Sequence, residues 1–575
     1  MATGMRVMRV LQSPPRCAEA AFVIAAVLSI VYIPQPERLV ALAYLSDHFH
    51  HLDFYAMAPA LAFRHGLALG TDFYSQYGVG WPMILAFLSN FTALSYTLLF
   101  AMIVIWGCLY FGILYAFLRQ LLGSWAWAMT GLLIALLLQL LSGAWGQPKW
   151  LWPSSTVARY SMDVLVFSAC LLHARSGRPW LGLLAGIFAA IAVLLGTETG
   201  VYLLVCLVLY PLAVLRMPSE AASPRSVGRF VALALLGFFS VLICGLAIAS
   251  RGTLLRTEFW LGWTESLRIY NHGFSHLPVA GAIAKDWKVA LLLILMLTSY
   301  LFAVSRACHE FACRRLSPGH LTVGLIGVYG LAILLLFIGR SHPYNLLHTS
   351  IPFCIVLTSF AAETYEAVWP GATGAKSPEL QALWGATRSI VPVGLAFAAL
   401  LGIYLHPAFA SYPNVGWWFH QQLGARASPD ANYLFASRRD GPLANNLRKD
   451  VSNFQAITST MRELSDSGRK SVAMIDGADT AYLLEADLRP HFRYSPVIAN
   501  LAFNHQVDLL AKQIGDHPPD YLLLPLEAPM MIYGVRAEDS HQRLLDVVQT
   551  HFIFDRQVAT MAVYRRGTQV TTSRQ

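Results

Sequence analysis

Charged residues are scarce in this chain of 575 residues. They make up 13% of it, whereas an ordinary globular domain carries about 25%. Hydrophobic residues make up 56%, more than a soluble core can absorb. Apolar stretches of about 17 to 23 residues, long enough to cross a bilayer, recur between residues 17 and 406. These features exclude an ordinary soluble protein and predict a polytopic membrane protein.

Cysteines are absent after Cys354, and most of the eight lie inside apolar stretches. Their spacing gives neither a disulfide framework nor a zinc pattern, so Cys308 and Cys313 are interpreted as free thiols. Repeats of 20 to 50 residues are also missing, which excludes a solenoid. No nucleic-acid-binding motif is present, so no nucleic-acid partner is expected. The net charge of +9 instead reflects the excess of Lys and Arg in the cytoplasmic loops of membrane proteins.

The hydropathy pattern predicts eleven membrane spans. The first is expected to stay in the mature protein, because no small-residue cleavage site follows it. Residues 81–96 are apolar but short, and we interpret them as a tilted or interfacial helix; two short crossings here are the alternative, so about 11 to 13 transmembrane helices are expected. The predicted spans are 17–34, 97–118, 125–142, 158–173, 180–195, 200–215, 230–250, 288–305, 320–338, 344–361 and 389–406.

The connecting segments divide into two sets. The set that begins with residues 1–16 and 119–124 holds 14 Lys and Arg residues, and the longer set that begins with 35–80 and 143–159 holds nine. The positive-inside rule predicts that the first set and the N-terminus are cytoplasmic. We therefore expect an all-α membrane domain over residues 1–410, with its first extracytoplasmic loop at 35–80. From about Ser411 short apolar runs alternate with polar helical stretches, which predicts a small soluble α/β extracytoplasmic domain over 411–575.

The first outward loop gathers acids and imidazoles next to the membrane surface. On a helix, Asp47 and His51 would be four residues apart, and His50 and Asp53 three, so that each acid shares a face with an imidazole. This spacing suits a proton relay with Asp47 or Asp53 as base. It equally suits a divalent metal such as Mg²⁺ or Mn²⁺ held by Asp47, His50, His51 and Asp53.

Other outward segments add polar groups to the same surface. Glu198 lies between two apolar runs, where an ionised carboxylate needs a partner or a watery cavity. Arg159 and Arg340 each begin a span, and His342 and Asn345 follow Arg340. Such arginines can simply snorkel to the interface. Taken together with the acidic loop, they would also suit an enzyme that holds a lipid phosphate while a carboxylate handles a proton.

Residues 52–82, LDFYAMAPALAFRHGLALGTDFYSQYGVGWP, resemble the first loop of the GT-C superfamily of polytopic glycosyltransferases, of the protein O-mannosyltransferase or aminoarabinose transferase type. The shared pattern is an acid and an aromatic, a small-residue helix, a Gly, an Asp-aromatic pair and a Pro that opens the next helix. The acidic pair of many members is here Asp53-Phe54, which leaves the choice between Asp47 and Asp53 open. The motifs GRSHPYNLLHTSIP and PSSTVARYS look like those of a bacterial branch of such proteins.

The resemblance implies a hexosyl- or pentosyltransferase of the bacterial inner membrane, surrounded by membrane lipids. No cofactor is expected other than the divalent cation, Mg²⁺ or Mn²⁺, left open above. The enzyme would move a sugar, with inversion, from a polyprenyl-phosphate donor to a glycan, lipid or protein acceptor. A transporter or flippase for lipid-linked saccharides and a non-catalytic membrane assembly protein are the alternatives. The expected substrate-binding residues are Arg64, Asp72, Gln76, Tyr77, Arg159, Glu198, Arg340, His342 and Asn345.

Overall fold

The structure is a computed structural model. It describes residues 16–34, 36, 39–40, 43, 49–141, 149–160, 162–218, 223–272, 279–281, 287–339, 343–368, 442–477, 479–497, 501, 504–526 and 537–567.

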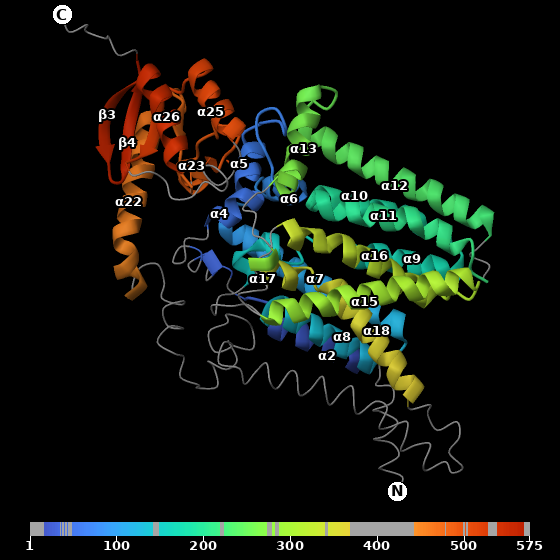
Figure 1. Cartoon of the computed structure of the whole chain (residues 1–575). Helices are drawn as coiled ribbons and strands as arrows, with labels where there is room; N and C mark the ends of the chain where they lie inside the picture. The colour runs from blue at the N-terminus through green and yellow to red at the C-terminus, as the bar shows by residue number, and fades with distance from the viewer. Residues whose placement is uncertain are drawn as a thin grey trace, which may run out of the picture.

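Long helices lie side by side and form most of the molecule (Figure 1). Five of them are long and apolar enough to cross a membrane, namely α7, α11, α12, α15 and α16, so the chain is a multi-pass membrane protein. The span predicted at 389–406 lies outside the described residues. The helices of the bundle are α2 (Arg16–Ile30), α7 (Tyr96–Leu122), α8 (Trp125–Leu136), α9 (Asp163–Ser176), α10 (Leu181–Leu195), α11 (Thr197–Val214), α12 (Pro224–Ser250), α15 (Trp287–Ala312), α16 (Pro318–Gly339) and α18 (Ile351–Val368).

Two predicted boundaries are wrong. The span expected at 158–173 begins only at Asp163, because Pro153–Ser155 forms a separate 3-10 turn, η5. The span expected at 344–361 is interrupted: α17 (Pro343–His348) ends before α18 begins at Ile351. Gln139 supports this break, since its Nε2 donates to the carbonyl oxygens of Leu347 and His348 at 2.8 and 2.9 Å.

Local sequence explains the tight joints between helices. The Ser124 hydroxyl caps α8, and Gly123 ends α7 in the left-handed conformation at φ 70°, where a side chain would be strained. Gly182 and Gly186 lie four residues apart on α10, and a Cβ at either would clash with a carbonyl of α12, at Phe230 or Ala234. This small-xxx-small spacing lets the two backbones touch, as in other membrane helix pairs.

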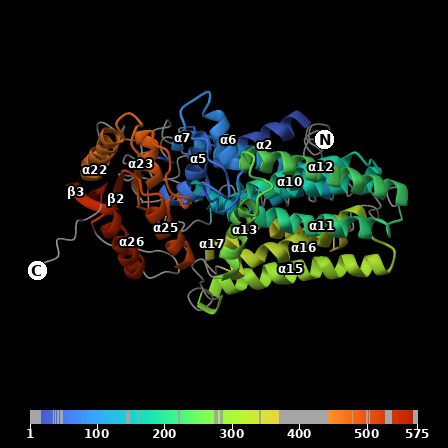
Figure 2. The ribbon, with the colours of Figure 1, turned by 90° about the horizontal axis from the view of Figure 1, so that it is seen from above.

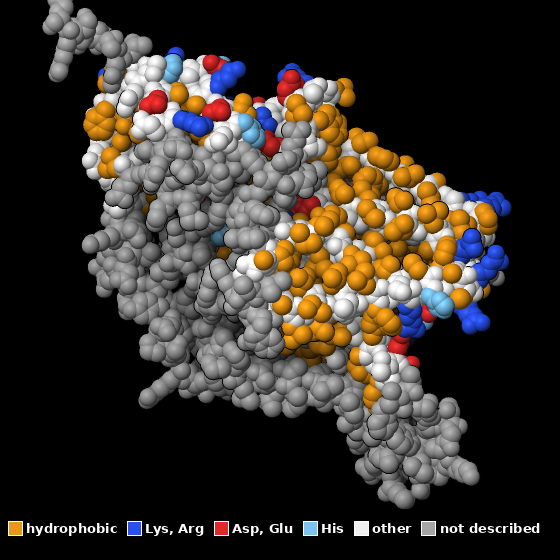
Figure 3. All heavy atoms as spheres, viewed as in Figure 1, with side chains coloured by type: hydrophobic (Ala, Val, Ile, Leu, Met, Phe, Trp, Pro, Cys, Tyr) orange, Lys and Arg blue, Asp and Glu red, His pale blue; other side chains and the backbone are white. Residues whose placement is uncertain are grey.

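Within the described residues, the two sets of connecting segments lie at opposite ends of the bundle. At one end, here called the basic end, Arg119 pairs with Glu19, Arg175 donates to the Gln120 carbonyl and Ser226 donates to the Gly177 carbonyl. At the other, the loop end, the first loop contacts Trp152, Thr197 and Ala249, which belong to three other connecting segments or helix ends. Figure 3 shows apolar side chains over the helices, with Lys and Arg gathered at the basic end.

The apolar stretch 81–96 does not form a span. Its helix, α6, runs from Gly80 to Leu88 and is about 14 Å long at 1.5 Å per residue, half of a bilayer core. Ile84, Phe87 and Phe91 remain exposed on it and on the turn that follows. The helix of this stretch is therefore short, as expected, and its place at the membrane interface stays a prediction.

Short helices build the loop end around the bundle. The first loop contains α4 (Phe49–Leu52), the π-helix η1 (Asp53–Met57) and α5 (Ala58–Arg64). The 3-10 turn η4 (Lys149–Leu151) precedes η5, and α13 (Thr257–His272) follows α12.

The C-terminal region, as described within residues 442–567, is a four-stranded sheet flanked by helices, placed at the loop end beside α5 (Figures 1 and 2). The strand order is β1-β2-β4-β3; β1 and β2 are parallel and the other pairs antiparallel. The boundary predicted at residue 411 lies outside the described residues. The elements are α22 (Pro442–Ser465), β1 (Val472–Met474), α23 (Asp479–Ala486), α25 (Asn504–Asp516), β2 (Tyr521–Pro525), α26 (Ala537–His551), β3 (Phe552–Val558) and β4 (Met561–Arg566).

The C-terminal region packs directly on the first loop and α13. The Tyr74 amide donates to the Arg493 carbonyl at 2.9 Å, and the rings of Tyr74 and Tyr494 are 5.8 Å apart. Glu265 of α13 accepts a hydrogen bond from the Tyr494 hydroxyl at 3.1 Å and pairs with Arg493 at 3.4 Å. Thus three segments far apart in sequence share one interface.

Candidate functional site

Asp53 is a fully buried acid in the first loop. It lies on η1, the single π-helical turn between α4 and α5, a distortion that is frequent at functional sites. Its Oδ1 accepts a hydrogen bond from the Tyr96 hydroxyl at 2.6 Å, while its Oδ2 has no partner among the described residues. Burial raises the pKa of Asp53 well above its usual value; the Tyr96 hydrogen bond opposes this rise and the nearby charge of Asp479 adds to it.

Arg159 and Glu198 form a buried ion pair beside the same loop. The Arg159 Nε donates to the Glu198 carboxylate at 2.7 Å, and the guanidinium lies 4.5 Å from the centre of the Tyr77 ring. The Thr197 amide donates to the Tyr77 carbonyl at 2.9 Å, and the Thr199 hydroxyl donates to the Arg159 carbonyl at 3.3 Å. The partner that the sequence demanded for Glu198 is therefore Arg159, and the two charges balance.

Several polar atoms around this ion pair are buried and unsatisfied within the described part of the chain. They are both side-chain amide atoms of Gln76, the Tyr55 hydroxyl and the Thr197 hydroxyl. The Tyr55 and Tyr77 ring centres are 5.7 Å apart, which places Tyr55 against the Arg159 group. An unpaired buried polar atom costs about 1–3 kcal/mol, so these groups would gain by bonding a polar ligand.

Lys149 is a buried cation that the site prediction missed. The side chain is only 2% exposed, and its Nζ donates to the Leu138 carbonyl at 3.3 Å, with no acidic partner in the described ranges. Burial lowers the pKa of Lys149 to about 7. The following Trp150 fits against Gly107, where a Cβ would clash with the indole. The flanking tryptophans in the sequence hinted at burial, but they suit interfacial anchoring equally well.

The turn η5 and its flanking Trp152 connect the Lys149 segment to the first loop. The centre of the His51 ring lies 5.3 Å from the centre of the Phe54 ring and 6.3 Å from that of the Trp152 ring. Asp53, by contrast, accepts a hydrogen bond from Tyr96. The predicted pairs, Asp47 with His51 and His50 with Asp53, stay predictions, because Asp47 and the side chain of His50 lie outside the described residues. No group of three His, Cys, Asp or Glu side chains is arranged to hold a metal in the regions that the structure describes.

Arg64 and Asp72 make contacts of another kind. Arg64 pairs with Asp487 of the C-terminal region at 3.4 Å, and both are exposed. The Asp72 carboxylate accepts from the Ala68 amide at 2.9 Å and so closes a turn of its own loop. These two residues join the loop to its surroundings rather than to the Arg159 group.

The remaining predicted residues are only partly visible. Asp47, Arg340 and His342 lie outside the described residues, as does the side chain of His50. Asn345 is half-buried on α17, and its carbonyl accepts from the Thr349 hydroxyl at 3.1 Å.

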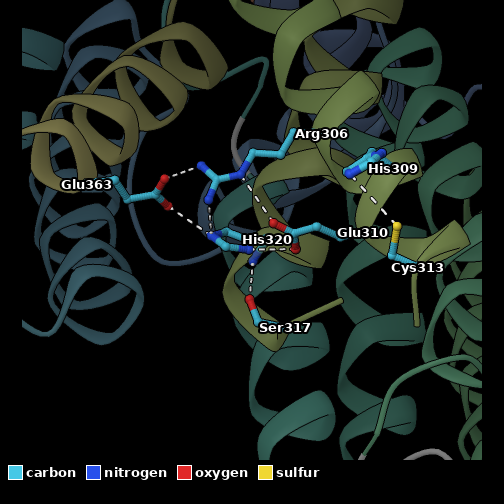
Figure 4. Close-up of polar contacts among 7 residues, drawn as sticks. All are labelled: Arg306, His309, Glu310, Cys313, Ser317, His320 and Glu363. Atoms are coloured by element: carbon cyan, nitrogen blue, oxygen red, sulfur yellow. Dashed lines mark hydrogen bonds and ion pairs between the residues drawn. The ribbon is translucent and has the colours of Figure 1, made fainter. Parts of the chain in front are cut away.

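The basic end carries a second polar cluster, drawn in Figure 4. Arg306 of α15 pairs with Glu310 at 3.3 Å and with Glu363 of α18. His320 of α16 bonds Glu310 at 2.6 Å and Glu363 at 3.1 Å. Every one of these four groups is bonded to another member, so the cluster ties three helices together.

No model of a protein family matches the chain, and no curated protein matches it. The structure is similar to ArnT from Cupriavidus metallidurans bound to undecaprenyl phosphate, with 14% identity, 99% of this chain and 100% of that chain covered and a TM-score of 0.45. It is similar to the archaeal oligosaccharyltransferase AglB from Archaeoglobus fulgidus in complex with an inhibitory peptide and a dolichol-phosphate (11% identity, 91% and 70% covered, TM-score 0.44). The arabinofuranosyltransferase AftD from Mycobacteria matches at 13% identity, with 96% and 40% covered and a TM-score of 0.42.

Because the TM-scores are below 0.5, the proposals that follow depend on the residues of this chain alone.

Proposed function

We propose that this chain is a membrane glycosyltransferase that moves a sugar from a polyprenyl-phosphate donor to an acceptor hydroxyl at the loop end, with Asp53 as the base. The observation that carries the proposal is the buried Asp53 carboxylate, whose Oδ2 is unpaired among the described residues while Tyr96 holds its Oδ1. The loop end would face outward from a bacterial inner membrane, with the N-terminus in the cytoplasm.

The reaction is a single displacement. The acceptor oxygen forms a bond to the anomeric carbon, its proton moves to Asp53 Oδ2, and the bond from that carbon to the phosphate oxygen breaks, with its electron pair leaving on the phosphate. One displacement inverts the anomeric centre. The raised pKa of Asp53 makes it a stronger base than an exposed carboxylate once it is ionised.

The departing phosphate needs a cation that is not already neutralised. Lys149 fits, because its buried Nζ bonds only a carbonyl among the described residues. The Arg159–Glu198 pair is neutral as a whole, but its fixed dipole and the unpaired Gln76, Tyr55 and Thr197 atoms offer hydrogen bonds to a sugar or phosphate.

The test offers purified protein in nanodiscs a panel of radiolabelled polyprenyl-phosphate pentoses and hexoses together with an envelope extract as acceptor. Asp53→Asn should lower transfer about 100- to 10,000-fold, the usual contribution of a general base. Asp508→Asn is the matched control and should keep most of the activity, because Asp508 is an exposed acid of the C-terminal region that pairs with Arg543 and does not line the cleft between that region and the first loop. No turnover by the wild type with any donor would contradict the proposal, and full transfer by Asp53→Asn would remove Asp53 as the base.

The pH profile provides a second readout. Because the folded-state pKa of Asp53 is raised, wild-type kcat/KM should fall as pH drops through a value above the usual aspartate range. For the same reason the unfolding free energy falls as pH rises from the usual aspartate range toward the raised folded-state pKa. Asp53→Asn removes this cost, so it should not reduce the unfolding free energy at pH 7. The proposal includes no cofactor, and a chelator added to the same reactions separates it from the metal interpretation of Asp47, His50, His51 and Asp53.

A further inference from the structure

A cleft of about 900 Å³ opens between the first loop and the C-terminal region. His65, Thr71 and Asp72 line it on the loop side, and Arg469, Lys470 and Arg489 line it on the C-terminal side. Its volume is at the upper end of the range for small-molecule sites, about 300–1,000 Å³. It is too small for the face of a folded protein and large enough for a short chain of sugars.

The acids that line the cleft are already bonded to the protein. Asp487 pairs with Arg64 at 3.4 Å, Asp520 accepts from the Ser471 amide and hydroxyl at 2.8 and 2.9 Å, and Asp72 accepts from the Ala68 amide. These bonds leave the acids with less capacity to attract a cationic ligand.

The arginines on the opposite wall are not paired with acids in this way within the described residues. Arg469 and Arg489 are exposed and make no ion pair within the described ranges, and Lys470 lies over the Tyr521 ring at 5.7 Å. Two buried nitrogens on the lining, His65 Nε2 and Arg493 Nε, also have no hydrogen-bond partner among the described residues. The cleft therefore presents unmatched positive charge and donors to a ligand.

The cleft is connected to the proposed base by one short helix. Asp487, Leu488 and Arg489 on its wall directly follow α23, which contacts η1 and α5. The first residue of α23, Asp479, is close enough for its charge to affect Asp53. The eight residues of α23 span about 12 Å at 1.5 Å per residue, so the wall of the cleft and the surroundings of Asp53 lie at the two ends of one short helix.

We propose that this cleft binds an anionic saccharide segment of the acceptor, with the carboxylate or phosphate groups of the ligand on Arg469, Lys470 and Arg489. The inference rests on the proposed function, because a transferase needs a surface that holds its acceptor near the base. Leu67, Leu488 and Pro490 give the same walls apolar patches for sugar rings.

Binding is measured with the full chain in nanodiscs by calorimetry, using pentagalacturonate against its fully methyl-esterified form and mannopentaose 6-phosphate against mannopentaose. The first pair tests a carboxylate, the second a phosphate. At least one anionic probe should bind about tenfold or more tightly than its neutral counterpart, and added salt should weaken it. Equal binding of both members in both pairs, or no binding of either anion, would overturn the proposal.

Charge reversal locates the site. Arg469→Glu with Arg489→Glu should weaken the anionic probe about tenfold or more. The control, Arg543→Glu with Arg556→Glu, changes the net charge equally on the same region but at residues that do not line the cleft. Unfolding curves verify that both double variants are folded. If the control weakens binding as much as the cleft variant, the anion is not held in the cleft.

The two proposals fail in different ways. Binding needs no turnover, so Asp53→Asn should keep the cleft affinity while it loses transfer. Charge-selective binding that depends on Arg469 and Arg489 in a protein without transferase activity would support the cleft and contradict the proposed reaction. Transfer activity together with equal binding of the anionic and neutral probes would support the proposed reaction and contradict the cleft proposal.

Discussion

The two ends of the helix bundle treat their polar groups differently. At the basic end the ionic groups satisfy one another: Glu19 with Arg119, and Arg306 and His320 with their two glutamates. At the loop end Asp53 keeps an unpaired oxygen and Lys149 bonds only a carbonyl, within the described residues. Mutual pairing is what a charge needs to hold helices together, whereas a buried group left without a full set of partners lowers stability and persists where function requires it.

The largest effect is expected at the buried ion pair of the loop end, Arg159 with Glu198. Arg159→Met leaves the Glu198 carboxylate buried without its cation, which should lower the unfolding free energy by about 3–5 kcal/mol. The double variant Arg159→Met with Glu198→Met removes both charges and should recover most of that loss. Detergent-titration unfolding measures the stability of the two proteins.

Transfer activity then separates two roles for this pair. If Arg159 contributes to substrate binding as proposed, the double variant recovers stability but not activity. Recovery of both would show that the pair is only structural, like the cluster at the basic end, and would break the contrast between the two ends.

A smaller effect is expected at Lys149. Lys149→Met should weaken undecaprenyl phosphate binding roughly 10- to 100-fold, because a hydrogen bond to a charged group contributes about 1.5–3 kcal/mol. In the wild type the folded-state pKa is about 7 and the ordinary value is 10.5, so the amine loses its proton as pH rises above 7. Affinity should therefore fall about fivefold from pH 7 to pH 8.

The stability of the wild type should change in the opposite direction. Between pH 7 and about 10 the unfolded chain holds the Lys149 proton that the folded chain has released, so the unfolding free energy should rise with pH. The lipid phosphate also titrates, and this changes the affinity of the wild type and of Lys149→Met alike. The difference in affinity between the two proteins at each pH therefore reports the Lys149 amine alone. The same pH dependence in Lys149→Met would exclude the amine as the phosphate-binding group.

The contrast also shows which features sequence reasoning can reach. The grouping of segments at two ends followed from hydropathy and Lys and Arg counts, because both are averaged over many residues. The need of Glu198 for a partner followed from the cost of a buried charge, but the identity of that partner did not, since Arg159 is 39 residues away and joins it only through the fold. The site prediction missed Lys149 for the same reason, because the burial of Lys149 depends on Trp150 fitting against Gly107 of α7.

The first loop shows the limit most clearly. Helical spacing placed Asp53 on one face with His50, whose side chain lies outside the described residues. The spacing indicated neither the π-helix that begins at Asp53 nor the hydrogen bond from Tyr96 to the Asp53 carboxylate. A π-helical turn shifts every later side chain around the axis, so i, i+3 and i, i+4 arguments no longer hold across it. The C-terminal region was expected on the outward side, but nothing in its sequence indicated that Arg493 and Tyr494 would pack on Tyr74.

The smallest effect is expected at the basic end. Glu363→Gln removes one acid that bonds both Arg306 and His320, but Glu310 remains to hold each of them. The side chains are partly exposed, at 38% for Glu363 and 32% for Arg306, so solvent screens the lost charge and the unfolding free energy should fall by about 1 kcal/mol or less.

Removing the remaining acid as well, in Glu310→Gln with Glu363→Gln, should cost more than the two single changes together, since Arg306 and His320 then lose every acid shown in Figure 4. Neither variant should change kcat/KM or the affinity for undecaprenyl phosphate, because the cluster acts only by joining α15, α16 and α18. A loss of transfer in the single variant at unchanged stability would mean that the basic end takes part in function and that pairing alone does not distinguish the two ends.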